Sequence, residues 1–153
     1  MVSFHGNGFR EVRQVAHFTI MGEPKGKDRP RFSTRGGAPR TYSTQATIDY
    51  EDAVREAFEA TGHPGYHDKE PVAITIHAYY NIPKSTSKAN RERMLRDEIL
   101  PTKKPDADNI AKIICDALNK HAYDDDAQVT FLAVSKYWAQ SEPYVEVDLW
   151  EAE

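Results

Sequence analysis

Cysteine and long apolar runs are what this sequence most lacks. Cys115 is the single cysteine in 153 residues, so no disulfide can form within the chain, and a reducing cytoplasm is the expected compartment. No apolar run approaches the roughly 20 residues that a membrane-spanning helix needs, so we expect no association with a membrane. Residues 1–15 lack the apolar segment of a secretory signal, and none is expected.

Several catalytic and ligand-binding motifs are also missing. The six histidines are scattered without ligand spacing and Cys115 has no cysteine partner, which argues against a zinc site. An EF-hand loop beginning at Asp106 would need an acid or asparagine at its fifth position, where Ile110 stands. Gly36-Gly37 lacks the lysine of a phosphate-binding P-loop, and no GxSxG motif is present.

The charges of the chain are segregated by sign. The composition, 39% hydrophobic and 29% charged, is that of a folded globular protein, and residues 1–153 fit a single domain. Residues 23–40 hold six basic residues against two acidic ones, and residues 82–104 hold seven against three. Residues 106–126 hold six aspartates against two lysines. This pattern indicates a basic surface for a polyanion beside a carboxylate cluster; the alternative is a solvated surface on which charges happen to gather.

Hydrophobic periodicity predicts the element order β-α-β-α-α-β-β. This order is typical of an α+β (mixed α/β) domain, with helices packed on one mixed sheet of about four strands. Strands are expected at residues 15–22, 72–80, 128–138 and 144–150, and helices at 43–60, 85–100 and from about 109. The strand at 128–138 is apolar on both faces, which predicts a central position. Residues 23–40, rich in Gly, Pro and Arg, are expected to form a loop.

The helix expected from Asn109 presents two distinct faces. Apolar residues at helical spacing predict its buried stripe: Ile110, Ile113, Ile114, Ala117 and Leu118. Asp108, Lys112 and Asp116 recur every four residues on the opposite face. Helix geometry therefore brings carboxylates and an amine together. An ordinary i,i+4 ion pair between Lys112 and Asp116 is the simpler interpretation.

Carboxylates gather on both sides of this helix. Asp106 and Asp108 stand at its start, and Asp124, Asp125 and Asp126 follow its end. Helix capping explains one of these aspartates but not five. Because like charges repel unless a cation lies between them, we expect the run at 124–126 to return beside the helix start around a shared ion. An all-carboxylate cluster favours Mg²⁺, with Mn²⁺ as a possible substitute.

A carboxylate-held Mg²⁺ beside a basic surface indicates phosphodiester chemistry. Such an ion binds a phosphate oxygen and lowers the pKa of a bound water. Lys112 is placed to neutralise charge that builds on the phosphoryl oxygens, unless it only balances the carboxylates. The candidate DNA-backbone contacts are Lys25, Lys27, Arg29 and Arg31. The basic residues of 84–96 either face DNA or form a solvated helix face, and Tyr42, Tyr79 and Tyr80 either stack on bases or pack within the protein.

The segment PDADNIAKIICDAL, followed by DDAQV, resembles the signature of the RusA family of Holliday junction resolvases, endodeoxyribonucleases of phage and prophage origin. GEPKGKDRPRF, and TYST before a helix containing YE, resemble that family too. The similarity runs from about residue 16 to about residue 138. It implies a RusA-like fold, a homodimer, and paired symmetrical nicks in four-way DNA junctions during DNA recombination and repair.

The resemblance also assigns roles to individual residues. Asp106 and Asp108 match the family's first two metal-binding aspartates, Asp126 matches the third, and Lys112 matches the catalytic lysine. The run at 124–126 has three acids where the family often has two, so the choice among them stays open. The sequence therefore predicts a Mg²⁺-dependent nuclease selective for branched DNA. The alternatives are a less selective metal-dependent nuclease on branched DNA or RNA, and a junction-binding module without catalysis.

Overall fold

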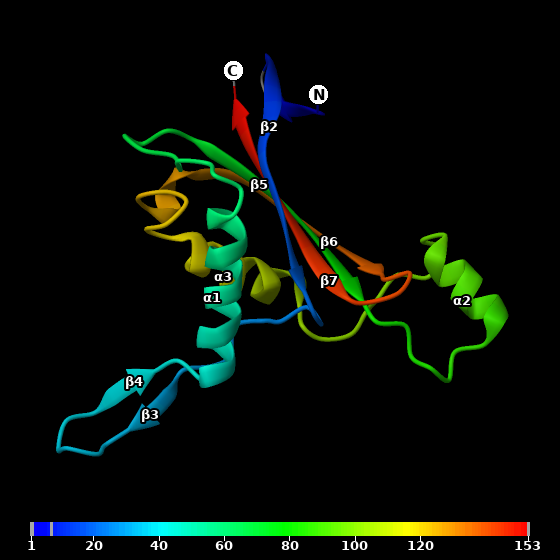
Figure 1. Cartoon of the computed structure of the whole chain (residues 1–153), viewed down its shortest axis with the longest axis horizontal. Coiled ribbons are helices and arrows are strands. Elements are labelled where there is room, and N and C mark those ends of the chain that lie inside the picture. The colour runs from blue at the N-terminus through cyan, green and yellow to red at the C-terminus, as the bar shows by residue number, and fades with distance from the viewer. Residues whose placement is uncertain (1, 7, 153) are drawn as a thin grey trace.

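A mixed five-stranded sheet forms the centre of the protein (Figure 1). The computed structural model describes residues 2–6 and 8–152, with the side chains of residues 13–151. The sheet order is β1-β2-β7-β5-β6, and all neighbours are antiparallel except the parallel pair β5 and β6. These strands are β1 (Val2–Gly6), β2 (Gly8–Met21), β5 (Val72–Tyr80), β6 (Val129–Trp138) and β7 (Tyr144–Ala152). The α+β class with a mixed sheet is confirmed.

Two helices cover one face of the sheet. They are α1 (Gln45–Glu59) and α3 (Ala107–Leu118), which also pack against each other, while α2 (Lys88–Leu95) lies at the far end of the sheet (Figure 1). α1 begins where the sequence predicts, because the Thr44 side chain accepts a hydrogen bond from the Thr47 backbone N–H at 3.2 Å. Within the described ranges, no helix is both long and apolar enough to cross a bilayer.

The predicted apolar stripe of α3 forms the centre of the core. Its five members, Ile110, Ile113, Ile114, Ala117 and Leu118, are fully buried. They meet the inward-facing residues of the sheet and the buried face of α1: Ile74, Ile76, Val145, Val147, Leu149, Val54 and Phe58. Each large apolar side chain buried here contributes about 1.5–3 kcal/mol to the free energy of folding. Packing therefore fixes which face of α3 points to solvent, and with it the positions of Asp108, Lys112 and Asp116.

The sheet order differs from the expectation at β6. This strand lies at the edge of the sheet, not at its centre, and Phe131 and Leu132 are 37% and 44% exposed. β7 does not form a hairpin pair with β6; it inserts between β2 and β5. Hydrophobic pattern alone does not distinguish the two positions, because a crossover through α2 and α3 places β6 beside β5 on the outer side.

The Gly, Pro and Arg-rich segment is not all loop. Within it lie β3 (Arg31–Ser33) and the start of β4 (Arg40–Tyr42), which pair with each other as a separate two-stranded antiparallel sheet. Figure 1 shows this hairpin extending beyond the start of α1 and away from the main sheet. β1 and the first part of β2 were also not expected from the sequence, and α2 is shorter than the predicted helix at 85–100.

Truncation of the α3 stripe tests its importance for folding. Ile113→Ala removes fully buried atoms and is expected to lower the free energy of unfolding by about 2–5 kcal/mol, because the neighbours cannot close the cavity. The matched control is Ile48→Ala on the exposed side of α1, expected to change it by less than about 1 kcal/mol. Urea denaturation measures both, and equal losses would contradict the assigned core.

Candidate functional site around helix α3

Two exposed carboxylates stand at the start of α3 without serving as caps. Asp106 occupies the N-cap position, and its backbone oxygen accepts from the Ile110 N–H at 3.0 Å, but its side chain makes no capping hydrogen bond. That carboxylate instead accepts from Lys104 Nζ at 2.8 Å. Asp108 is exposed in the first turn and has no hydrogen bond or ion pair among the described side chains. Capping therefore does not account for either carboxylate, although the helix dipole favours both.

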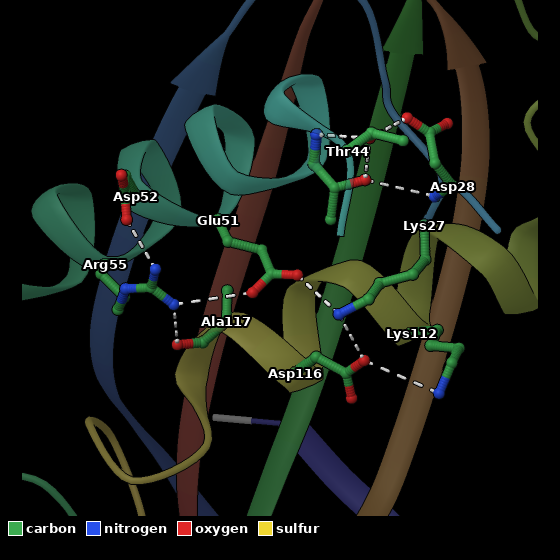
Figure 2. Close-up of polar contacts among 10 residues, drawn as sticks. Lys27, Asp28, Thr44, Glu51, Asp52, Arg55, Lys112, Asp116 and Ala117 are labelled. Atoms are coloured by element: carbon green, nitrogen blue, oxygen red, sulfur yellow. Dashed lines mark hydrogen bonds and ion pairs between the residues drawn. The ribbon is translucent and has the colours of Figure 1, made fainter. Parts of the chain in front are cut away.

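Farther along α3, a lysine from outside the helix joins the charged face (Figure 2). Lys27 Nζ lies 2.6 Å from Glu51 Oε1 on α1 and 2.9 Å from Asp116 Oδ2 on α3. Lys112 Nζ lies 3.6 Å from the same Asp116 oxygen. The side chain of Lys27 is only 19% exposed. We call this group, Lys27, Glu51, Lys112 and Asp116, the inter-helix network.

The pKa of Lys27 reports the strength of these contacts. Partial burial alone would lower it, but the hydrogen bonds to Glu51 and Asp116 outweigh burial and raise the pKa of Lys27 above its ordinary value. Lys27 is therefore a permanently charged bridge between α1 and α3 at neutral pH.

The segment that carries Lys27 is held closely against the start of α3. The Lys27 backbone N–H donates to the Asn109 carbonyl oxygen at 3.3 Å. A Cβ atom on Gly26 would lie 2.4 Å from Asn109 Nδ2, so any larger residue here would displace the Asn109 side chain. Next to it, Thr44 Oγ1 donates to Asp28 Oδ2 at 2.6 Å, which lowers the pKa of Asp28. Residues 24–28 thus form a strap that joins the N-terminal ends of α1 and α3.

The four predicted DNA contacts divide into two kinds. Lys27 is engaged in the inter-helix network, and Lys25 pairs with Asp28 at 3.1 Å. Arg29 and Arg31 are exposed, and neither pairs with a carboxylate among the described side chains. DNA contact by these residues stays a prediction, with only the two arginines fully available for it. Of the three tyrosines, Tyr80 is buried and donates to the Pro105 oxygen, Tyr79 stacks on Tyr144, and Tyr42 is exposed.

The three acids at 124–126 have three different environments. The Asp124 carboxylate lies 3.2 Å from His67 Nδ1. Asp125 caps the 3₁₀ turn η1 (Asp126–Gln128). Its carboxylate accepts a hydrogen bond from the Ala127 N–H at 2.9 Å, and the Asp125 backbone N–H donates to Gln128 Oε1. Asp126 faces α3. The capping and pairing roles of the first two leave Asp126 as the member directed towards the charged helix face.

Asp126 lies in an excess of negative charge. Burial raises its pKa first, the charge of Asp116 raises it further, and a hydrogen bond from Tyr123 and the charge of Lys112 oppose the change without cancelling it. An extra cation at this place would relieve the repulsion between the two carboxylates. Burial raises the pKa of the neighbouring Cys115 thiol to about 11, which disfavours its reactive thiolate form at neutral pH.

The structure brings the predicted residues together in two groups. Asp126 lies with Asp116 and Lys112, and Asp106 lies with Lys104 at the helix start. α3 has 12 residues, so its ends are about 18 Å apart, and the chain returns to β6 along its second half. Lys112, one turn after Asp108 and near Asp126, lies between the groups. Among the described residues, no three acidic, His or Cys side chains form a ready-made metal site. The ligand set Asp106, Asp108 and Asp126 stays a prediction.

Glu51 and the bridging role of Lys27 were not found by sequence reasoning. Lys27 lies in the segment KGKDRPRF and Glu51 in YE, and these short segments are the only sign of them in the sequence. The contacts of Lys27 with Glu51 and Asp116 join positions 24 and 89 residues apart, which no local pattern relates.

Comparison with known proteins finds a family match over most of the chain. The family model for the endodeoxyribonuclease RusA matches residues 21–149, which include the strap, all three α-helices and the acids at 124–126. The chain belongs to the RusA endodeoxyribonuclease family. The chain is also similar to the uncharacterized protein YqaN of Bacillus subtilis (strain 168). The two are 38% identical over 133 residues, which cover 85% of this chain and 92% of YqaN. Membership of this family supports an endodeoxyribonuclease activity.

Loss of the Lys27 charge tests the inter-helix network. In Lys27→Met two carboxylates lose their shared cation while an apolar stem remains, and we expect the free energy of unfolding to fall by about 1–3 kcal/mol. The matched variant Lys25→Met removes a more exposed pair and is expected to cost less than about 1 kcal/mol. Urea denaturation compares them, and an unchanged midpoint in Lys27→Met would show that the network does not hold the helices together.

The raised pKa of Lys27 also predicts a pH dependence. A group whose pKa is higher in the folded state contributes stability that is complete below its unfolded pKa and is lost as the pH rises through the folded value. An unfolded lysine has a pKa of about 10.4. Above that pH, the wild-type protein should therefore lose more stability than the Lys27→Met variant. Thermal unfolding of both proteins from neutral to alkaline pH measures the difference, and parallel curves would refute this prediction.

Proposed function

We propose that this chain is a Mg²⁺-dependent, structure-selective DNA endonuclease that resolves four-way (Holliday) junctions by paired symmetrical nicks. Membership of the RusA family supports cleavage of DNA. The observation that carries the site is that Asp126 lies beside Asp116 and Lys112, where burial and the charge of Asp116 raise the pKa of its carboxyl. This cluster of carboxylates favours the binding of a cation, and the neighbouring Lys112 can contact a phosphate group.

The donor chemistry fits a hard divalent ion. Asp106, Asp108 and Asp126 would hold Mg²⁺ or Mn²⁺, since all three offer exposed carboxylate oxygens, and the two groups would have to converge on the bound ion. The bound ion would supply Lewis-acid activation of the phosphodiester. Asp108 supports this role because it has no partner of its own among the described side chains. Asp126 supports it because burial and then the negative charge of Asp116 raise its pKa, and a cation would favour its ionised form.

Lys112 is proposed to stabilise the transition state. Its side chain is exposed, and its one ion pair, to Asp116, is long at 3.6 Å. Asp116 is already paired with Lys27 at 2.9 Å, so Lys112 is free to turn towards a phosphoryl oxygen as charge builds there. Hydrolysis by water would leave 5′-phosphate and 3′-hydroxyl ends.

Paired nicks require two sites. A homodimer with two-fold symmetry would present identical α3 faces to two strands of like polarity in a four-way junction. We therefore propose that the active species is a homodimer.

Cleavage of a panel of substrates tests the proposed activity. Labelled immobile four-way junctions, flaps, linear duplex and single strands are incubated with the protein and Mg²⁺, and in parallel with EDTA. We expect paired nicks on the junction alone, and none with EDTA. Equal cutting of flaps or RNA would identify a less selective nuclease. Junction binding without cleavage would identify a binding module.

Two neighbouring aspartates give a matched test of the site. Asp126→Asn removes the charge that faces α3 and is expected to lower the cleavage rate by at least about 100-fold, while junction binding is kept or tightened. Asp125→Asn keeps a side chain that can cap η1, and we expect it to cut within a few-fold of wild type. Single-turnover cleavage measures both. Asp108→Asn should behave as Asp126→Asn does; wild-type cutting by either variant would refute the assigned site.

A further inference from the structure

Among the strands that the structure describes, β3 and β4 pair with no strand of the main sheet. They pair with each other, in the register Arg31 with Tyr42, Phe32 with Thr41 and Ser33 with Arg40. From residue 29 to residue 42 every residue is exposed except Ser33, which is half-buried. An isolated two-stranded hairpin is marginally stable in water, and this one buries no apolar face against the main sheet (Figure 1). Packing against the core therefore does not account for the presence of this hairpin.

The two ends of the hairpin are nevertheless fixed. At its base, Thr44 Oγ1 donates to Asp28 Oδ2 at 2.6 Å, joining the residue before the hairpin to the N-cap of α1. At its tip, the Gly37 N–H donates to the Thr34 oxygen at 3.2 Å, and Gly36 and Gly37 have φ values of +89° and +86°, which favour glycine. The hairpin is thus a built element held in a defined relation to α1 and, through the strap, to α3.

The charge of the hairpin has one sign. Residues 29–42 contain Arg29, Arg31, Arg35 and Arg40 and no acid. None of these arginines lies within ion-pairing distance of a carboxylate among the side chains that the structure describes. Because cross-strand partners and alternate residues share a face, Arg31 and Arg40 lie on the same face, together with Tyr42, which is 50% exposed. Phe32, 64% exposed, lies on the other face.

We propose that the β3–β4 hairpin is a DNA-binding arm that grips a duplex arm of the substrate away from the cleaved phosphate, with Arg31 and Arg40 on its backbone phosphates. A two-stranded ribbon fits the major groove of B-DNA, and unpaired arginines with no neighbouring acid favour phosphate. The identity of the polyanion as DNA rests on the proposed function. The arm carries affinity for the substrate, while the charged face of α3 carries the chemistry.

The test is a binding measurement on the full chain. The double variant Arg31→Ala/Arg40→Ala (the arginine variant) is compared with Arg13→Ala/Lys69→Ala (the control variant), which removes the same charge at two exposed positions outside the hairpin. Fluorescence anisotropy with a labelled four-way junction and a linear duplex, in EDTA, is repeated over a range of salt concentrations. We expect the arginine variant to bind about ten-fold more weakly, with a salt slope smaller by about 1.8. The control variant should bind within about two-fold of wild type.

Circular dichroism and thermal unfolding confirm that each variant is folded, which is expected because all four side chains are exposed. Wild-type affinity and salt slope in the arginine variant would overturn the proposal, as would equal losses in both double variants. If wild type binds DNA through the hairpin but cuts none, the arm stands and the proposed nuclease activity fails. If wild type makes paired nicks and the arginine variant binds normally, the activity stands and the arm fails.

Discussion

The geometry of the site depends on one cation between two helices. Lys27 Nζ contacts Glu51 on α1 and Asp116 on α3, and its backbone N–H is hydrogen-bonded to Asn109. A partly buried ion pair adds little net stability, because desolvation offsets the attraction, but removal of one partner leaves the others unpaired in a place that water solvates poorly. The network therefore acts mainly by fixing a single arrangement. It sets the distance between α1 and α3, and it holds the strap from which the β3–β4 hairpin extends.

The same bridge controls the charge balance on the exposed face of α3. Asp116 takes most of its compensation from Lys27, so Lys112 is only loosely held by it. Asp126 lies beside Asp116; burial and then the charge of Asp116 raise its pKa, and the charge of Lys112 opposes this rise without cancelling it. A polyanion does not approach such carboxylates unless positive charge is brought with it. In the proposed function a divalent ion and Lys112 supply that charge at the cleaved bond, while the arginines of the hairpin hold the substrate at a distance.

The crossover between β5 and β6 explains which carboxylates meet. Tyr80 at the end of β5 donates to the Pro105 oxygen, so α3 begins near that end of the sheet. α3 then runs back, and the chain enters the parallel strand β6 from the opposite end. The acids at 124–126 consequently arrive beside the second half of α3, next to Asp116, and Lys112 is the residue between them and Asp108. The sequence predicts that this run also meets the helix start around a shared ion, and that convergence stays a prediction.

Local features could be predicted from the sequence, since they depend on neighbouring residues. The buried stripe of α3 and a helix over most of residues 43–60 follow from periodicity, and the segments PDADNIAKIICDAL and DDAQV place the chain in its family. Sheet order, the pairing of β3 with β4, and the partners of Lys27 were decided by the tertiary structure alone. Each joins segments that a linear pattern does not relate, and each depends on how the whole chain buries its apolar faces. The distinct roles of Asp124, Asp125 and Asp126 are of this second kind, because adjacent identical residues differ only in what the fold places against them.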